Sequence, residues 1–106
     1  MDHKSVEEYI LSMPNARLDY PFGKEAAVYK TRDKMFAIIM EGKEPVQVSL
    51  KCDPILAETL RAKYDTVMPG YHLNKKHWNT IVLTGQLAWD EVKDLIKHSY
   101  DLVAKA

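Results

Sequence analysis

The sequence predicts an α+β domain in which helices pack on one face of an antiparallel β-sheet of about four or more strands. Three observations predict this class and the element order α-β-β-β-α-β-α. A short capped helix begins the chain, three strand-like segments follow with only short turns between them, and a longer amphipathic helix ends it. Strands joined by short turns pair antiparallel, and flanking helices pack on the resulting sheet. The 106 residues fit one domain over residues 1–106.

The first helix is predicted over about residues 6–13. Ser5 begins a capping box, in which its hydroxyl accepts from the Glu8 amide and the Glu8 carboxylate accepts from the Ser5 amide. Apolar residues then recur at helical spacing. Pro14 ends the helix, because proline disfavours helical backbone in the residue before it. Residues 18–23 contain both Pro and Gly and are predicted to form a loop.

Three strands are predicted in succession, over residues 26–30, 35–40 and 46–51. The middle segment is a continuous apolar run, which predicts a strand covered on both faces or nearly so. The third alternates apolar with polar residues, which predicts one face in contact with water. A fourth strand is predicted over residues 80–84 and is stopped by Gly85.

Two more helices are predicted. Asp53 caps the free amides at the start of the second helix, and Pro54 follows at a position where its missing N–H costs nothing. Met68-Pro-Gly70 predicts a break in regular structure. The last helix is predicted from about Trp89 to Ala104. Its apolar side is expected to carry Val92, Leu95, Ile96, Ser99 and Val103.

The charges of the chain are balanced overall but unevenly distributed. There are 15 basic and 15 acidic residues, so the net charge gives no global attraction to nucleic acid or to anionic lipid. Between Asp65 and Asp90, however, no acidic residue occurs. Any electrostatic role is therefore expected to come from this uneven distribution of charge.

Composition also bounds the setting of the protein. No apolar run approaches the roughly 18 residues that a membrane helix needs, and no apolar signal stretch follows the N-terminus. The single cysteine excludes an internal disulfide. We expect a cytoplasmic protein that does not bind membranes, with a monomer as the favoured state.

The segment of residues 71–80 is the best candidate site. It combines two His, two Lys, two Asn, Tyr71 and Trp78. Lysine neutralises phosphate, asparagine bonds phosphates or base edges, and aromatic rings stack on bases. The alternative is that Leu73 and Trp78 are packing residues and that the polar residues solvate a loop. The nucleic-acid- or anion-binding candidates are Lys51, His72, Asn74, Lys75, Lys76, His77 and Asn79.

No metal, cofactor or catalytic site is predicted. His72 and His77 are five residues apart, which separates them by about 140° on a helix and puts them on opposite faces of a strand. Cys52 precedes a helix cap, which can activate a thiol, but a single cysteine is more often a small buried hydrophobe. The chain has no phosphate-binding glycine loop, and no carboxylate pair is singled out by spacing. We therefore do not expect an enzyme.

Local patterns across nearly the whole chain resemble those of the MmcQ/YjbR family. The most specific is His72-Leu-Asn-Lys-Lys-His-Trp78. The full set is Met13-Pro14, Asp19–Gly23, Lys34–Ala37, Val48–Pro54, Tyr71–Thr80 and Ser99-Tyr100.

The resemblance implies a frataxin-like fold, a CyaY-like two-layer sandwich, and DNA binding with hairpins acting as wings. It supplies no catalytic residues, and frataxin's iron chemistry does not follow from the fold alone. In the DNA hypothesis, Lys51, Lys75 and Lys76 contact phosphates. Asn74, His77 and Asn79 position the phosphates or contact base edges. So few cations predict weak binding. The alternative partner is another protein or a small anionic ligand, bound by an adaptor domain without catalytic activity.

Overall fold

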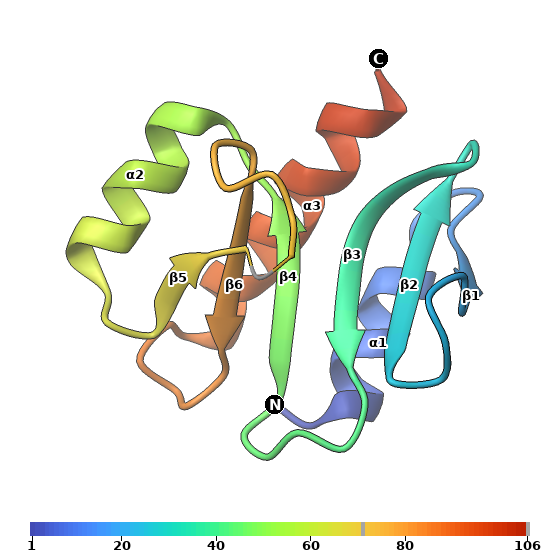
Figure 1. Cartoon of the computed structure of the whole chain (residues 1–106), viewed down its shortest axis with the longest axis horizontal. Helices are drawn as coiled ribbons and strands as arrows, with labels where there is room; N and C mark the ends of the chain where they lie inside the picture. Colours follow the sequence, from blue (N-terminus) through green and yellow to red (C-terminus); the bar gives the residue numbers. More distant parts are fainter. Residues whose placement is uncertain (71, 106) are drawn as a thin grey trace.

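The computed structural model describes residues 1–70 and 72–105. Six strands form one antiparallel sheet in the order β1-β2-β3-β4-β6-β5, together with three helices (Figure 1). In chain order the elements are α1 (His3–Leu11), β1 (Arg17–Asp19), β2 (Ala26–Thr31), β3 (Lys34–Met40), β4 (Gln47–Lys51), α2 (Pro54–Lys63), β5 (Val67–Pro69), β6 (Trp78–Val82) and α3 (Trp89–Ala104). The predicted α+β class and antiparallel sheet are confirmed.

The main core lies between the helices and one face of the sheet. In Figure 1, α1 and α3 lie behind the sheet, and α3 packs mainly on β3 and β4. The Ser99 hydroxyl of α3 accepts from the Lys51 amide at 2.9 Å and donates to the Phe36 carbonyl, which fixes the helix to both strands. On α2, Leu60 packs against the same core. The opposite face of the sheet therefore carries no helix in the described part of the chain.

Two short edge strands were not predicted. β1 overlaps the expected loop at residues 18–23, and β5 occupies part of the expected break at residues 68–70. All three residues of β1 are exposed, so its sequence has no alternation between buried and exposed positions. β5 ends at Pro69, which is tolerated because the strand lies at the edge of the sheet. The predicted element order was therefore incomplete at both edges.

The first helix begins earlier than its capping box predicted. The N-cap is Asp2, whose carboxylate accepts from the Ser5 amide at 2.8 Å. Ser5 is therefore inside the helix, three residues beyond a cap of equal strength. The cap of α2 is as predicted, because the Asp53 carboxylate accepts from the Ile55 and Leu56 amides, each at 3.1 Å.

None of the helices in residues 1–70 and 72–105 combines the length and apolar content needed to cross a membrane.

Candidate functional site

The helix-free face of the sheet carries a groove. One row of directly paired residues crosses five strands on this face, namely Val28, Ile38, Ser49, Thr80 and Met68. Directly paired residues of antiparallel strands project to the same side, so the row forms part of a continuous surface. The floor of the groove is lined by Ala26, Ile38, Met40, Gln47, Ser49 and Thr80.

Two segments, the loop before β2 and the region of β5 with the loop after it, form the walls of the groove. Phe22 and Glu25 come from the loop before β2, while Pro69, His72 and Leu73 come from β5 and the loop after it. Met68 and Lys43 complete the lining. The groove has a volume of about 780 Å³, and most of its surface is apolar.

Two hydroxyls form the most buried polar feature of the floor. Ser49 Oγ and Thr80 Oγ1 are 2.7 Å apart, and the two residues are only 6% and 5% exposed. Their sequence positions are far apart, and the pairing of β4 with β6 brings them together. A hydrogen-bonding pair of this kind beneath an apolar groove can orient a ligand.

The loop of residues 72–77, hereafter the 72–77 loop, is built largely by its own polar residues. The Asn74 side-chain oxygen accepts from the Lys76 amide at 3.0 Å, and the Asn74 carbonyl accepts from the His77 amide at 3.1 Å. The His77 carbonyl accepts from the Cys52 amide at 2.7 Å, which joins the loop to the end of β4. Asn74 thus stabilises a turn, as short polar side chains commonly do.

Asn79 is not available to a ligand. It is 2% exposed and lies on the helix-covered face, opposite Leu50. Its side-chain oxygen accepts from the Arg61 guanidinium at 3.0 Å, and its amide nitrogen donates to the Ala57 carbonyl at 3.2 Å. Arg61 also donates to the Lys75 carbonyl at 2.9 Å and so ties α2 to the 72–77 loop. We therefore leave Asn79 out of the binding set.

The remaining candidates lie in different surroundings. His72 lines the groove, Lys75 and Lys76 are exposed on the 72–77 loop, and His77 is half-buried. Lys51 is at the end of β4, opposite Trp78. Tyr71, which the sequence placed in the same segment, lies outside the described residues.

Trp78 supports the packing alternative for part of the segment. It is 7% exposed and shares the open face with Thr80. Gly70 packs directly on it, because a Cβ at Gly70 would lie 2.8 Å from the Cβ of Trp78. The Cβ of Trp78 on β6 therefore lies directly against the Gly70 backbone at the end of β5.

Comparisons with known proteins identify the family of the chain. A family model described as YjbR matches residues 11–102. The chain belongs to the YjbR family. It is 37% identical over 93 residues to the uncharacterized protein YjbR of Escherichia coli strain K12, a match that covers 88% of this chain and 79% of that protein. The uncharacterized protein YbdF of Escherichia coli O157:H7 is 33% identical over 101 residues, covering 95% and 83%.

Solved structures support the YjbR-family fold. The crystal structure of Deinococcus radiodurans protein DR2400 matches with a TM-score of 0.92 at 34% identity, over 96% of this chain and 78% of that one. A crystal structure of a Pseudomonas syringae protein matches with a TM-score of 0.82 at 31% identity, over 96% and 98%. The resemblance inferred from the sequence motifs is confirmed, whereas the likeness to frataxin stays a prediction.

Cys52 of this YjbR-family chain is a buried free cysteine. It is 4% exposed, and burial, reinforced by the neighbouring Asp53 carboxylate, raises the pKa of its thiol to about 11. It borders a small open hollow of about 10 Å³ whose lining includes no histidine, whereas His72 lines the groove. Outside positions 71 and 106, no three His, Cys, Asp or Glu side chains are arranged to hold a metal ion.

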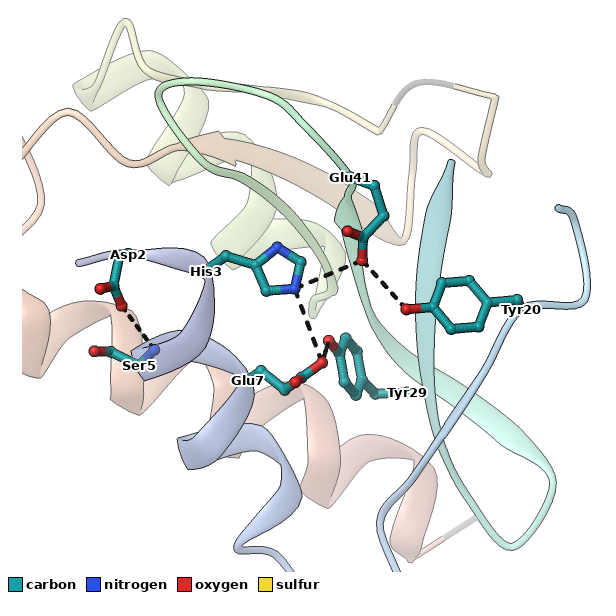
Figure 2. A network of polar contacts seen from close by, with 7 residues as sticks. All are labelled: Asp2, His3, Ser5, Glu7, Tyr20, Tyr29 and Glu41. Atoms are coloured by element: carbon teal, nitrogen blue, oxygen red, sulfur yellow. Dashed lines mark hydrogen bonds and ion pairs between the residues drawn. The ribbon is translucent and has the colours of Figure 1, made fainter. Parts of the chain in front are cut away.

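A polar network that the sequence did not predict joins α1 to the sheet (Figure 2). His3 Nε2 lies 3.8 Å from a Glu7 carboxylate oxygen and 3.6 Å from one of Glu41. Tyr29 donates to Glu7, and Tyr20 donates to Glu41 at 3.3 Å. His3 and Glu7 are four residues apart on α1, but the sequence did not predict this pairing because the helix was expected to begin at about residue 6. The other partners are brought in by the fold.

The network supports one wall of the groove. Burial, followed by the hydrogen bond to Glu7, raises the pKa of Tyr29 far above its ordinary value, and burial followed by the Glu41 charge raises that of Tyr20. Both tyrosines therefore remain hydrogen-bond donors at neutral pH. The Glu41 amide also donates to the Glu25 carbonyl at 2.8 Å, so the end of β3 holds the loop of Phe22 and Glu25 at two points.

Proposed function

We propose that this YjbR-family chain is a binding domain without catalytic activity, and that its groove holds a small molecule. The groove itself carries the proposal. Small-molecule sites generally enclose roughly 300–1,000 Å³, with mostly apolar walls and a few placed polar groups. The groove has a volume of about 780 Å³, an apolar floor and one buried hydroxyl pair, and it therefore has the dimensions and chemistry of such a site.

The placement of the reactive side chains supports a role in binding without chemistry. Nucleophilic catalysis needs a nucleophile within hydrogen-bond reach of a base. The groove lining includes His72 but neither Cys52 nor His77. With its thiol pKa at about 11, Cys52 is almost entirely protonated at neutral pH.

Nuclear magnetic resonance with a library of small apolar fragments tests the proposal. Fragments that bind should shift the backbone amide signals of Ile38, Ser49 and Thr80. The variant Ala26→Trp should abolish these shifts, because Ala26 lines the groove and an indole there fills it. Ala62→Trp, on the exposed surface of α2, is the matched control and should leave them unchanged. Shifts located elsewhere, or none with any fragment, would contradict a groove ligand.

A second candidate function is weak nucleic-acid binding by Lys51, Lys75 and Lys76. None of these three ammonium groups forms an ion pair with the described residues, so their charges are not neutralised inside the fold. Three phosphate contacts would give a slope of at most about 3 when the logarithm of the binding constant is plotted against that of salt concentration. The affinity is expected to be detectable only at low salt.

Fluorescence anisotropy of a labelled DNA duplex at low salt tests this candidate. Lys75→Ala/Lys76→Ala should weaken binding and reduce the salt slope by about 2. Lys4→Ala/Lys34→Ala is the control for net charge, because it removes two exposed lysines, on α1 and at the start of β3, that likewise form no ion pair among the described residues. No binding by the wild type, or an equal loss in both double variants, would exclude a site on the 72–77 loop.

A further inference from the structure

The hydroxyl pair on the groove floor has one more donor than the protein uses. Ser49 and Thr80 have two hydroxyl protons, and their mutual hydrogen bond consumes one. Neither hydroxyl makes any other hydrogen bond with the described residues. Whichever of the two donates to its neighbour, the second proton is left for an acceptor in the groove, since both residues line it.

A second polar group lies on the same strand. Gln47 is two residues before Ser49 on β4, so both side chains project from the same face about 7 Å apart. Within residues 1–70 and 72–105, the Gln47 side-chain amide has no hydrogen-bond partner. The floor therefore offers two polar positions in an otherwise apolar surface formed by side chains such as Ile38 and Met40.

The two charged residues in the lining of the groove carry charges of opposite sign. With the His72 imidazole counted as neutral, the lining contains one carboxylate, on Glu25, and one ammonium group, on Lys43, both exposed. No charged side chain belongs to the floor. Moving an ion onto an apolar floor costs its hydration, and this lining supplies no net opposite charge to offset that cost. The charge pattern therefore matches a ligand without net charge, in contrast to the small anionic ligand that was one alternative partner from the sequence.

One wall of the groove is aromatic. Phe22 is 64% exposed although it borders the groove, and its loop is fixed by Tyr20 and Glu41. An exposed phenyl ring held at the edge of an apolar floor offers a face for offset or edge-to-face contact with another ring. A flat aromatic ligand would cover this ring and the floor together.

We propose that the groove selects a flat, neutral aromatic molecule whose carbonyl oxygen accepts the unused hydroxyl proton of the Ser49–Thr80 pair. This inference rests on the groove being a small-molecule site. It adds the chemical class of the ligand and the contact that orients it. The carbonyl would lie over the centre of the sheet, with the ring system extending toward Phe22.

Nile red is a suitable probe, because it is a neutral, flat aromatic dye with a ring carbonyl. Its fluorescence would be titrated with the wild type and with Ser49→Ala/Thr80→Val, which removes both hydroxyls and nearly preserves shape. Replacing both partners of a hydrogen bond by similar apolar groups is close to neutral for stability. Thr59→Val, which removes an exposed hydroxyl on α2 outside the groove, is the matched control. Backbone amide spectra would verify the fold and locate the dye.

The expected result is that Nile red shifts the amides of Ser49 and Thr80, and that the double variant binds it roughly 3- to 10-fold more weakly, as for loss of one neutral hydrogen bond. Thr59→Val should bind like the wild type. Phe22→Ala, which removes an exposed ring and leaves the fold intact, should also weaken binding.

Different failures have different meanings. Equal binding by the double variant and the wild type would overturn the carbonyl contact, and tighter groove binding of anionic anilinonaphthalene sulfonate would overturn the neutral class. In either case the groove would still be a ligand site. If neither dye shifts the groove amides, the ligand class is overturned, while the fragment screen independently decides whether the groove binds small molecules at all.

Discussion

Replacement of Asn79 by alanine should destabilise the fold without changing a binding surface. The side chain is 2% exposed and makes two hydrogen bonds, one with the charged Arg61 guanidinium and one with the Ala57 carbonyl. Losing a hydrogen bond to a charged group costs about 1.5–3 kcal/mol, and losing a neutral one costs about 0.5–1.5 kcal/mol. Arg61 is half-buried and regains some hydration, so we expect a total loss of about 2–3 kcal/mol.

Urea unfolding followed by tryptophan fluorescence measures this loss. Asn74→Ala is the control, because its exposed side chain serves only a local turn and its removal should cost about 0.5 kcal/mol or less. In a double-mutant cycle, Arg61→Ala and Asn79→Ala should show a coupling free energy of about 1 kcal/mol or more, because the two side chains are in contact. The reasoning is refuted if Asn79→Ala is as stable as the wild type while ligand or duplex binding disappears.

Three further substitutions or reactions follow from the structure. Gly70→Ala should lower the free energy of unfolding, measured by urea titration, by about 1–3 kcal/mol, because the new Cβ would lie 2.8 Å from the Trp78 Cβ. Unchanged stability would contradict this close packing. Cys52 should react with a disulfide reagent at pH 8 about 100-fold more slowly than a free cysteine, because its thiol pKa of about 11 is 2 units above the ordinary 9.0, and urea should remove the protection. Burial and the hydrogen bond to Glu7 raise the pKa of Tyr29, so the contribution of this pair to stability is complete below pH 10 and declines as pH rises further. Tyr29→Phe should flatten that decline in the pH profile of the free energy of unfolding. An identical pH profile for the variant and the wild type would refute this role of Tyr29.

The parts of the fold that were predictable are those with strong local signals. The apolar run of β3 and the cap at Asp53 each determine their element almost without help from the rest of the chain. The edge strands β1 and β5 lack such signals, because each has three residues and gains its structure from one neighbouring strand. Asp2 and Ser5 illustrate a different limit. Both are good caps, and local chemistry alone does not choose between them.

The sequence alone could not predict the groove, because the groove depends on how the strands pair. Its central contact joins Ser49 to Thr80, which are 31 residues apart and meet only through the register of β4 against β6. A shift of one residue in that register would turn Thr80 to the helix-covered face and Asn79 to the groove. Neither hydroxyl was a candidate in the sequence, because serine and threonine in strands are common and carry no spacing signal.

The motif that identified the family is divided by the sheet itself. Successive side chains of a strand project to opposite faces, so Trp78 and Thr80 lie on the groove side while Asn79 between them faces α2. An alanine scan along the motif should therefore alternate in its effects. The substitution Asn79→Ala should affect stability, and Thr80→Ala should affect ligand binding. Lys75→Ala should affect only binding to polyanions. One compact motif can thus serve the core, the groove and the exposed loop together, since β6 is the strand at which all three meet.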